Sequence, residues 1–136
     1  MRFFILAALL LATPVHAETL AGPYAAEIVR VIDGDTVEAR IRVWLGLDQT
    51  VRVRIRAIDA PEMHGDCPEA AAQSKDALAR LLGSGAVILS NIKHDKYGGR
   101  VDASLTLADG RDVGAEMLRT KHAVPWPRPK GASSCP

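Results

Sequence analysis

The chain has 136 residues, of which 48% are hydrophobic and 24% charged, so it is long enough for one domain with a core and too short for two. This composition excludes a disordered, collagen-like or coiled-coil chain, and two cysteines exclude a disulfide-dense scaffold or a four-cysteine zinc module. With 17 basic and 16 acidic residues, the net charge of +1 excludes a polybasic nucleic-acid-binding protein, so any polyanion must bind at a local site.

The N-terminus has the pattern of a cleavable secretory signal. A basic residue precedes the apolar run Phe3–Ala12, which is too short to span a bilayer because a spanning helix needs about 20 residues. Small or apolar residues occupy the positions that signal peptidase reads, so we expect a signal peptide over residues 1–17, cleaved between Ala17 and Glu18. An uncleaved anchor or a buried N-terminal helix is the alternative. The mature chain, 18–136, is then expected to be a single domain with 16 basic and 16 acidic side chains. We expect it to be secreted or periplasmic and not bound to a membrane.

The first half of the mature chain predicts three strands. Glu27–Ile32 alternates weakly, Thr36–Trp44 is rich in β-branched and apolar residues, and the turn signal Asp33-Gly34-Asp35 joins them into a hairpin. After a second turn at Gly46–Gln49, the strand Thr50–Ile58 has the clearest alternation. Its apolar face is expected to hold Val51, Val53, Ile55 and Ala57. Its opposite face is expected to hold Arg52, Arg54 and Arg56.

The second half predicts two helices and two strands. Residues 68–82 are expected to form a helix, because Pro68 suits a first helical position and Gly83 suits a C-terminal stop. The remaining elements are the strands Ala86–Ile92 and Val101–Leu107 and the helix Val113–Lys121. No β–α–β alternation runs through this order, which disfavours a doubly wound parallel sheet. We therefore expect an α+β fold that is mainly β, a five-stranded OB-fold barrel with two helices.

The two cysteines are placed to hold the C-terminal tail. The tail after Val124 contains four prolines and cannot continue as a helix or a central strand, so it needs an anchor. In an exported protein Cys67 and Cys135 can pair, closing a loop of about 70 residues and stabilising the fold by up to roughly 4 kcal/mol. The alternative is a metal site formed by both cysteines and His64, which offers only three ligands.

Four carboxylates lie at expected strand ends and turns, where functional sites concentrate: Asp33, Asp35, Asp59 and Glu62. Oxygen ligands of this kind suit Ca²⁺ or Mg²⁺. The EF-hand spacing is absent, because Trp44 and not a glutamate stands at the twelfth position counted from Asp33. A metal site would therefore combine Asp35 from one turn with Asp59 from another. Taken alone, the Asp-Gly-Asp sequence is typical of a plain turn.

Basic side chains gather in two places. Arginines on one strand face repel one another unless they are solvated, paired or facing an anion, and a solvated outer face is one interpretation. The other is that Arg54, five residues before Asp59, binds a phosphate with its bidentate guanidinium. The second group is the turn Lys93–Arg100, which contains one aromatic residue. It is either a solvated hairpin tip or a loop that contacts phosphates and bases.

Three segments, in this order and at this spacing, resemble the staphylococcal nuclease (thermonuclease) family. They are VIDGDTV over Val31–Val37, RIRAIDAPE over Arg54–Glu62 and DKYGGR over Asp95–Arg100, and the resemblance covers roughly residues 26–124. It implies an OB-fold barrel, in agreement with the predicted order of elements. It also implies a calcium-dependent nuclease, a hydrolase that cleaves phosphodiester bonds of DNA and RNA and leaves 3′-phosphate ends.

The resemblance assigns roles to individual residues. The implied calcium ligands are Asp35, Asp59, the backbone carbonyl of Ala60 and, through water, Asp33. The implied catalytic residues are Glu62, which accepts a proton from water or orients it, and the phosphate-binding pair Arg54 and Arg100. The implied substrate-binding residues, near a terminal phosphate, are Lys96 and Tyr97. In such a site calcium polarises a phosphoryl oxygen and positions the ester.

The sequence departs from the family's pattern at three places. Ala60 stands where the best-known member has threonine, although the implied ligand is the backbone; an extra glycine precedes Arg100 and shifts it by one position. The tail lacks the long C-terminal helix and a second nucleotide-contacting tyrosine, so Trp126 either packs or stacks on a base. The second hypothesis is a non-catalytic OB-fold module that binds nucleic acid. We expect the enzyme, because the motif positions hold the residue types that the chemistry needs. We also expect it to act as a monomer.

Overall fold

A computed structural model describes residues 17–133 and residue 135. The predicted signal peptide therefore lies outside the described residues, apart from Ala17. Within the described part, no helix is both long enough and apolar enough to cross a membrane.

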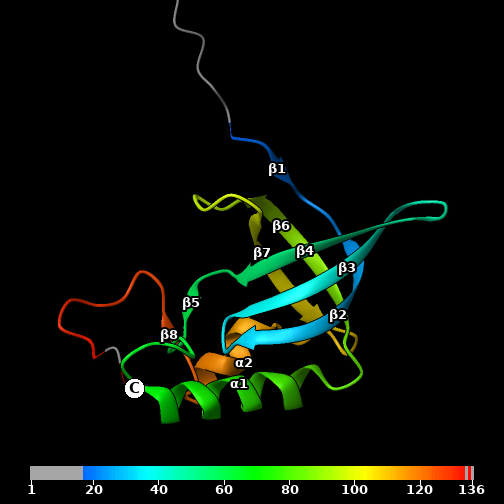
Figure 1. Cartoon of the computed structure of the whole chain (residues 1–136). Coiled ribbons are helices and arrows are strands. Elements are labelled where there is room, and N and C mark those ends of the chain that lie inside the picture. The colour runs from blue at the N-terminus through cyan, green and yellow to red at the C-terminus, as the bar shows by residue number, and fades with distance from the viewer. Residues whose placement is uncertain (1–16, 134, 136) are drawn as a thin grey trace, which may run out of the picture.

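Five strands form a closed barrel (Figure 1). They are β2 (Tyr24–Asp33), β3 (Thr36–Trp44), β4 (Leu47–Ile55), β6 (Ala86–His94) and β7 (Arg100–Leu107). The order is β6-β2-β3-β4-β7, and pairing of β7 with β6 closes the barrel; the β4–β7 pair is parallel and the other pairs are antiparallel. This confirms the predicted α+β, mainly β, five-stranded barrel.

Two helices and three short strands complete the fold. The helices α1 (Pro68–Leu82) and α2 (Val113–Arg119) lie together at one end of the barrel (Figure 1). The short strand β1 (Thr19–Leu20) pairs with β6, and β5 (Ile58–Asp59) pairs with β8 (Val124–Pro125) outside the barrel. The bounds of α1 are those predicted, whereas α2 ends two residues early.

The core follows the alternation of the strands. Side chains with no exposed surface point into the barrel from four strands: Val37, Ala39, Val53, Leu89, Ala103 and Leu105. The helices close the barrel end with Leu78 and Leu82 from α1 and with Val113 and Met117 from α2. Burial of these aliphatic side chains is the main stabilising contribution, about 1.5–3 kcal/mol for each large one.

The bounds predicted for the arginine-bearing strand are wrong, because β4 begins at Leu47 and not Thr50 and ends at Ile55 and not Ile58. Ala57 is exposed and has a φ of 63°, so it does not join the apolar face of Val53 and Ile55. The strand ends at Ile55, the chain turns, and Ile58 points into the core instead. The turn breaks the two-residue period, and it brings Asp59 back alongside the end of β4.

Close packing explains the glycine between the two aspartates of the β2–β3 turn. A Cβ atom at Gly34 would lie 1.9 Å from Oγ of Ser74 on α1 and 2.9 Å from Cβ of Ala60. The turn is therefore pressed against α1 and the segment after β5. This contact fixes the position of Asp35 relative to Asp59.

The C-terminal tail is attached to the start of α1 by a disulfide between Cys67 and Cys135, whose Cα atoms are 5.6 Å apart. The predicted pairing is confirmed. The alternative metal site with His64 is wrong, because both sulfur atoms are used in the bond. The disulfide closes a loop between residues 68 positions apart in the sequence.

Removing this disulfide is expected to destabilise the fold. The double variant Cys67→Ala/Cys135→Ala should lose up to roughly 4 kcal/mol of unfolding free energy, because its unfolded chain is less constrained. Urea denaturation of the oxidised protein, the reduced protein and the double variant measures the loss. Equal unfolding free energies for the three forms would contradict a stabilising role.

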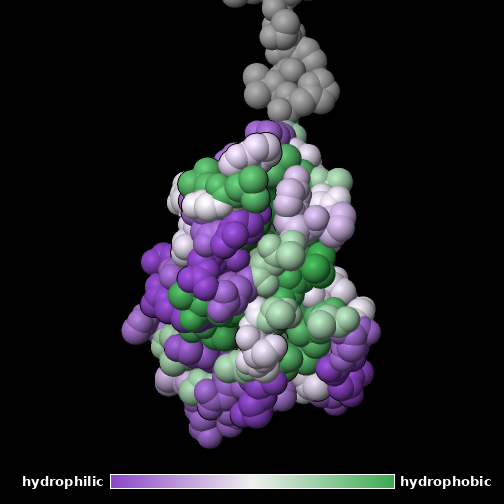
Figure 2. All heavy atoms as spheres, turned by 90° about the vertical axis from the view of Figure 1, so that its right-hand side faces the viewer, coloured by the Kyte–Doolittle hydropathy of each residue, from purple (hydrophilic) through white to green (hydrophobic). Residues whose placement is uncertain are grey.

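The β3–β4 hairpin projects well beyond the barrel (Figure 1). Its tip exposes four large apolar side chains: Val43, Trp44, Leu45 and Leu47. Figure 2 views the molecule from this side and shows hydrophobic residues gathered between hydrophilic ones. The hairpin points away from β5 and β8, so its tip is remote from these two strands (Figure 1).

Candidate active site

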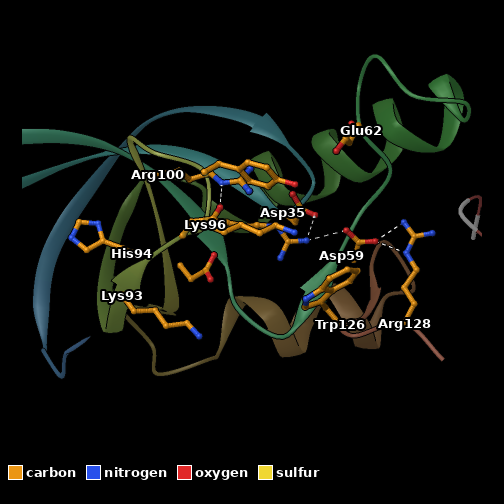
Figure 3. A pocket seen from close by; sticks show the side chains of 13 residues that line it. Asp35, Asp59, Glu62, Lys93, His94, Lys96, Arg100, Trp126 and Arg128 are labelled. Carbon is orange, nitrogen blue, oxygen red and sulfur yellow. Dashed lines mark hydrogen bonds and ion pairs between the residues drawn. The ribbon is translucent and has the colours of Figure 1, made fainter. Parts of the chain in front are cut away.

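A cleft of about 670 Å³ opens on the side of the barrel that carries β5, β8 and the β6–β7 loop (Figure 3). It gathers seven of the residues that the sequence predicts for catalysis, metal binding or substrate binding: Asp35, Arg54, Asp59, Glu62, Lys96, Tyr97 and Arg100. They come from three separate segments of the chain. The fold thus brings the three motifs to one place.

Asp35 is a buried acidic residue of the cleft, with 6% of its surface exposed. Its Oδ2 accepts a hydrogen bond from the backbone amide of Ala60 (2.8 Å), and its Oδ1 accepts one from the hydroxyl of Thr36 (2.8 Å). Burial raises the pKa of Asp35, and these hydrogen bonds together with the charge of Arg54 offset only part of that effect. Both oxygens of this carboxylate are therefore hydrogen-bonded within the protein, and little of the residue is exposed to solvent.

Arg54 lies between the two aspartates that the sequence proposes as metal ligands. Its Nη2 donates to Oδ1 of Asp59 (3.0 Å) and forms an ion pair with Oδ2 of Asp35 (3.6 Å). The side chain is 17% exposed, so this contact is largely shielded from water. The anions that Arg54 faces here are carboxylates, and the guanidinium remains at the edge of the open cleft.

The other two arginines of the same strand face diverge from Arg54. Arg52 is exposed, and Arg56 donates from Nη1 to the backbone carbonyl of Asn91 (2.9 Å). The solvated interpretation therefore holds for Arg52, whereas phosphate binding by Arg54 stays a prediction. Two of its arginines lie outside the cleft, and one takes part in it.

The β6–β7 loop contributes a second arginine. Arg100, the first residue of β7, forms an ion pair with Asp95, and the extra glycine before it does not carry it out of the cleft. Tyr97 lies within cation–π distance of Lys96 (5.0 Å) and Arg100 (5.2 Å). Burial alone would raise the pKa of Asp95, but the hydrogen bond and charge of Arg100 and the nearby amides hold it below its usual range. Arg100 is therefore held at the cleft by its ion pair with Asp95.

Of the three remaining predicted site residues, only Glu62 lines the cleft. Glu62 lines the cleft from the segment between β5 and α1 and is exposed to solvent (Figure 3). Asp33 does not line the cleft; it accepts a hydrogen bond from the amide of Met63 (3.0 Å) and so supports the segment that carries Glu62. Ala60 is buried, and its amide holds Asp35.

Sequence reasoning considered Trp126 only as a packing or base-stacking residue, and it missed Arg128. Arg128 binds Oδ2 of Asp59 through both Nε and Nη2, and Trp126 lies over Arg54, with its ring centroid 5.5 Å from Cζ (Figure 3). The cleft is also lined by Lys93, His94 and Asp102. The sequence signal for the tail was Cys135, which anchors it, but nothing in the sequence says where its side chains point.

The charges of the cleft balance. Its cationic lining residues are Arg54, Lys93, Lys96, Arg100 and Arg128. Its carboxylates are Asp35, Asp59, Glu62, Asp95 and Asp102. With histidine neutral, the formal charge is zero. The lining residues alone therefore give the cleft no net positive charge with which to attract a polyanion.

The donor set fits a hard divalent cation. Asp35 and Asp59 both approach a single atom, Nη2 of Arg54, so the two carboxylates already surround a position that a cationic group occupies. Calcium takes six to eight oxygen ligands and accepts water among them, so two carboxylates are a partial set. Among the described residues, no three histidine, cysteine, aspartate or glutamate side chains converge as a metal cluster. Water or substrate oxygens would have to complete the shell.

Comparison with known proteins gives distant relatives. No protein-family model matches the chain. It is similar to "Protein ParB" of Escherichia coli, 38% identical over 120 residues that cover 83% of this chain and 60% of that protein. It is also similar to two proteins named "Uncharacterized endonuclease", from Escherichia coli and Escherichia coli O157:H7, each 33% identical over 92 residues that cover 68% of this chain and 54% of the relative. The chain thus spans between 54% and 60% of the length of these curated relatives.

Proposed function

We propose that the chain is an exported, calcium-dependent nuclease of the staphylococcal nuclease type. In this proposal it hydrolyses phosphodiester bonds of DNA and RNA and leaves 3′-phosphate ends. The observation that carries it is the meeting of Asp35 and Asp59 around the guanidinium of Arg54, in a cleft that also holds Arg100 and Glu62. Two relatives that carry the name "Uncharacterized endonuclease" are consistent with hydrolysis of nucleic acid.

Asp35 and Asp59 would hold the calcium ion. When bound, the ion polarises a phosphoryl oxygen and adds two positive charges to a cleft whose own charges balance. Asp35 suits a ligand's role because the Ala60 amide and the Thr36 hydroxyl fix its carboxylate. Little reorganisation of this side chain is then needed on binding.

The two arginines would bind the phosphate. Attack on a phosphodiester adds negative charge at phosphorus, and guanidinium groups placed in advance stabilise that charge. Arg54 is positioned by Asp35 and Asp59, and Arg100 by Asp95. Each guanidinium uses only some of its five N–H donors in these pairs, so donors remain for phosphate oxygens.

Glu62 would act on the attacking water. It is exposed at the cleft margin, so water reaches it freely, and its carboxylate can accept a proton or orient the nucleophile. The segment that carries it is held by the bond from the Met63 amide to Asp33. This gives Asp33 a supporting role in the proposed reaction.

Export is supported by two features. The predicted signal peptide directs the chain out of the cytosol, and the Cys67–Cys135 disulfide is typical of oxidising compartments. Mass spectrometry of protein recovered outside the cytosol should find an N-terminus at Glu18 and no free thiol.

Calcium removal is the experiment that tests the proposed function. The oxidised protein should cleave single-stranded DNA and RNA with Ca²⁺ and lose this activity in a chelator. Without the ion, the carboxylate of Asp59 would remain paired with Arg54 and Arg128. Re-addition of Ca²⁺ should restore the rate, and 3′-end analysis should find phosphate. Binding of DNA without cleavage at any calcium concentration would favour the non-catalytic module, and cleavage in the chelator would contradict calcium dependence.

A further inference from the structure

The tail brings two side chains onto the cleft that no motif predicts, Trp126 and Arg128. It is held there at both ends. On one side, β8 pairs with β5 so that Val124 stands opposite Asp59, and the amide of Trp126 donates to the carbonyl of Ala57 (2.9 Å). On the other side, the disulfide of Cys135 ties it to the start of α1.

Both carboxylate oxygens of Asp59 are engaged by guanidinium groups. Oδ1 accepts from Arg54 (3.0 Å), and Oδ2 accepts from Nε of Arg128 and pairs with its Nη2. A divalent cation that uses Asp59 must therefore take the place of one of these contacts. The proposed calcium ligand is already neutralised by the chain itself.

Arg128 is the group that can leave. Arg54 has two carboxylate partners and lies under Trp126, whereas Arg128 pairs only with Asp59 among the described carboxylates. Within the described part of the chain its one other polar contact is long, from Nη1 to the carbonyl of Ser133 (3.5 Å). Its side chain is 27% exposed, against 17% for Arg54, so it can swing away from Asp59 into solvent.

We propose that Arg128 is a substrate-positioning residue that exchanges partners. Without a divalent cation it neutralises Asp59; when Asp59 holds the cation, the freed guanidinium binds a phosphate of the nucleic acid strand in the same cleft. Arginine suits both partners, because its planar fork matches carboxylate and phosphate oxygens alike. The inference rests on the proposed function, since it needs a cation at Asp59 and a phosphodiester substrate.

The exchange predicts effects of opposite sign for one substitution. Arg128→Gln removes a competitor for Asp59, so calcium should bind the nucleic-acid-free protein about three- to tenfold more tightly. The same substitution removes a phosphate contact, so a strand should bind about three- to tenfold more weakly at saturating calcium. These factors correspond to about 0.6–1.4 kcal/mol, at and above the upper end of the range for fully exposed ion pairs, because Arg128 is only partly exposed. An arginine that only positioned Asp59 would weaken calcium binding on removal.

Both affinities are measured in a Glu62→Gln background, so that the strand is not cleaved. Isothermal titration gives the Ca²⁺ dissociation constant, and fluorescence anisotropy with a labelled single-stranded DNA decamer gives that of the strand. Arg119→Gln is the matched control, because Arg119 pairs with Glu116 on α2 outside the cleft and should change neither. Circular dichroism checks that each variant is folded.

The outcomes separate the inference from the proposed function. Tighter calcium binding together with weaker strand binding supports the exchange. Unchanged or weaker calcium binding, or unchanged strand binding, overturns it while leaving the nuclease proposal in place. If the parent protein with Arg128 intact binds no calcium, the proposed function fails first and the exchange fails with it.

Discussion

Arg54→Met is expected to slow phosphodiester hydrolysis by about 10²–10³-fold at saturating calcium, the usual effect of removing one preorganised donor from a transition state. The change should fall mainly on kcat, because the charge that Arg54 opposes develops during attack on phosphorus. Arg54→Lys keeps a positive charge but loses the planar fork, so it should recover part of the rate. The measurement is steady-state hydrolysis of a single-stranded oligonucleotide.

Variants of Arg54 also need a control for folding. Arg54 neutralises Asp35 and Asp59, so its loss leaves two largely buried carboxylates close together. Calcium at saturating concentration would supply the missing positive charge, which is why the rates are compared there. Arg40→Met is the matched control, because Arg40 lies on β3, is exposed and pairs with Glu27. A rate for Arg54→Met within threefold of that control would contradict its role.

Glu62→Gln is expected to reduce kcat by about 10²–10⁴-fold, the range found for loss of a positioned general base. The substitution removes the proton acceptor and keeps the size of the side chain. Because Glu62 is exposed, the unfolding free energy should change by less than about 0.5 kcal/mol. The calcium affinity should also stay close to that of the parent, since Glu62 is not among the proposed ligands.

Glu69→Gln provides the comparison for this second variant. Glu69 lies in the first turn of α1, is exposed and does not line the cleft. The two variants should therefore differ in kcat and agree in stability. If Glu62→Gln hydrolysed DNA at the rate of Glu69→Gln, another group would have to act on water.

The barrel could be predicted because its signals are local. The alternation of Val53 and Ile55 with arginines marks a strand that is half buried, and Pro68 and Gly83 mark the ends of α1. The error at Ala57 has the same origin. Alternation continues past the end of β4 by chance, whereas the chain turns there at a residue with positive φ.

The sequence could predict only those cleft residues that belong to the three motifs. Asp35, Asp59 and Arg54 lie in segments whose order and spacing carry information, and the fold brings them into contact. Arg128 has no such signal, because a proline-rich tail has no periodicity to orient a side chain. Its position depends on the disulfide and on the β5–β8 pairing, both of which join residues far apart in the sequence.

The most direct test of the proposed site is the calcium dependence of DNA hydrolysis by the oxidised protein and by Asp35→Asn. The substitution keeps the shape of a buried side chain and removes the charge that would bind the ion, with Asp59→Asn as a second variant at a more exposed position. The parent should reach a saturating rate as Ca²⁺ is added, whereas each variant should need at least about tenfold more Ca²⁺ or remain inactive. Calcium curves that coincide for the parent and both variants would contradict a metal site at Asp35 and Asp59.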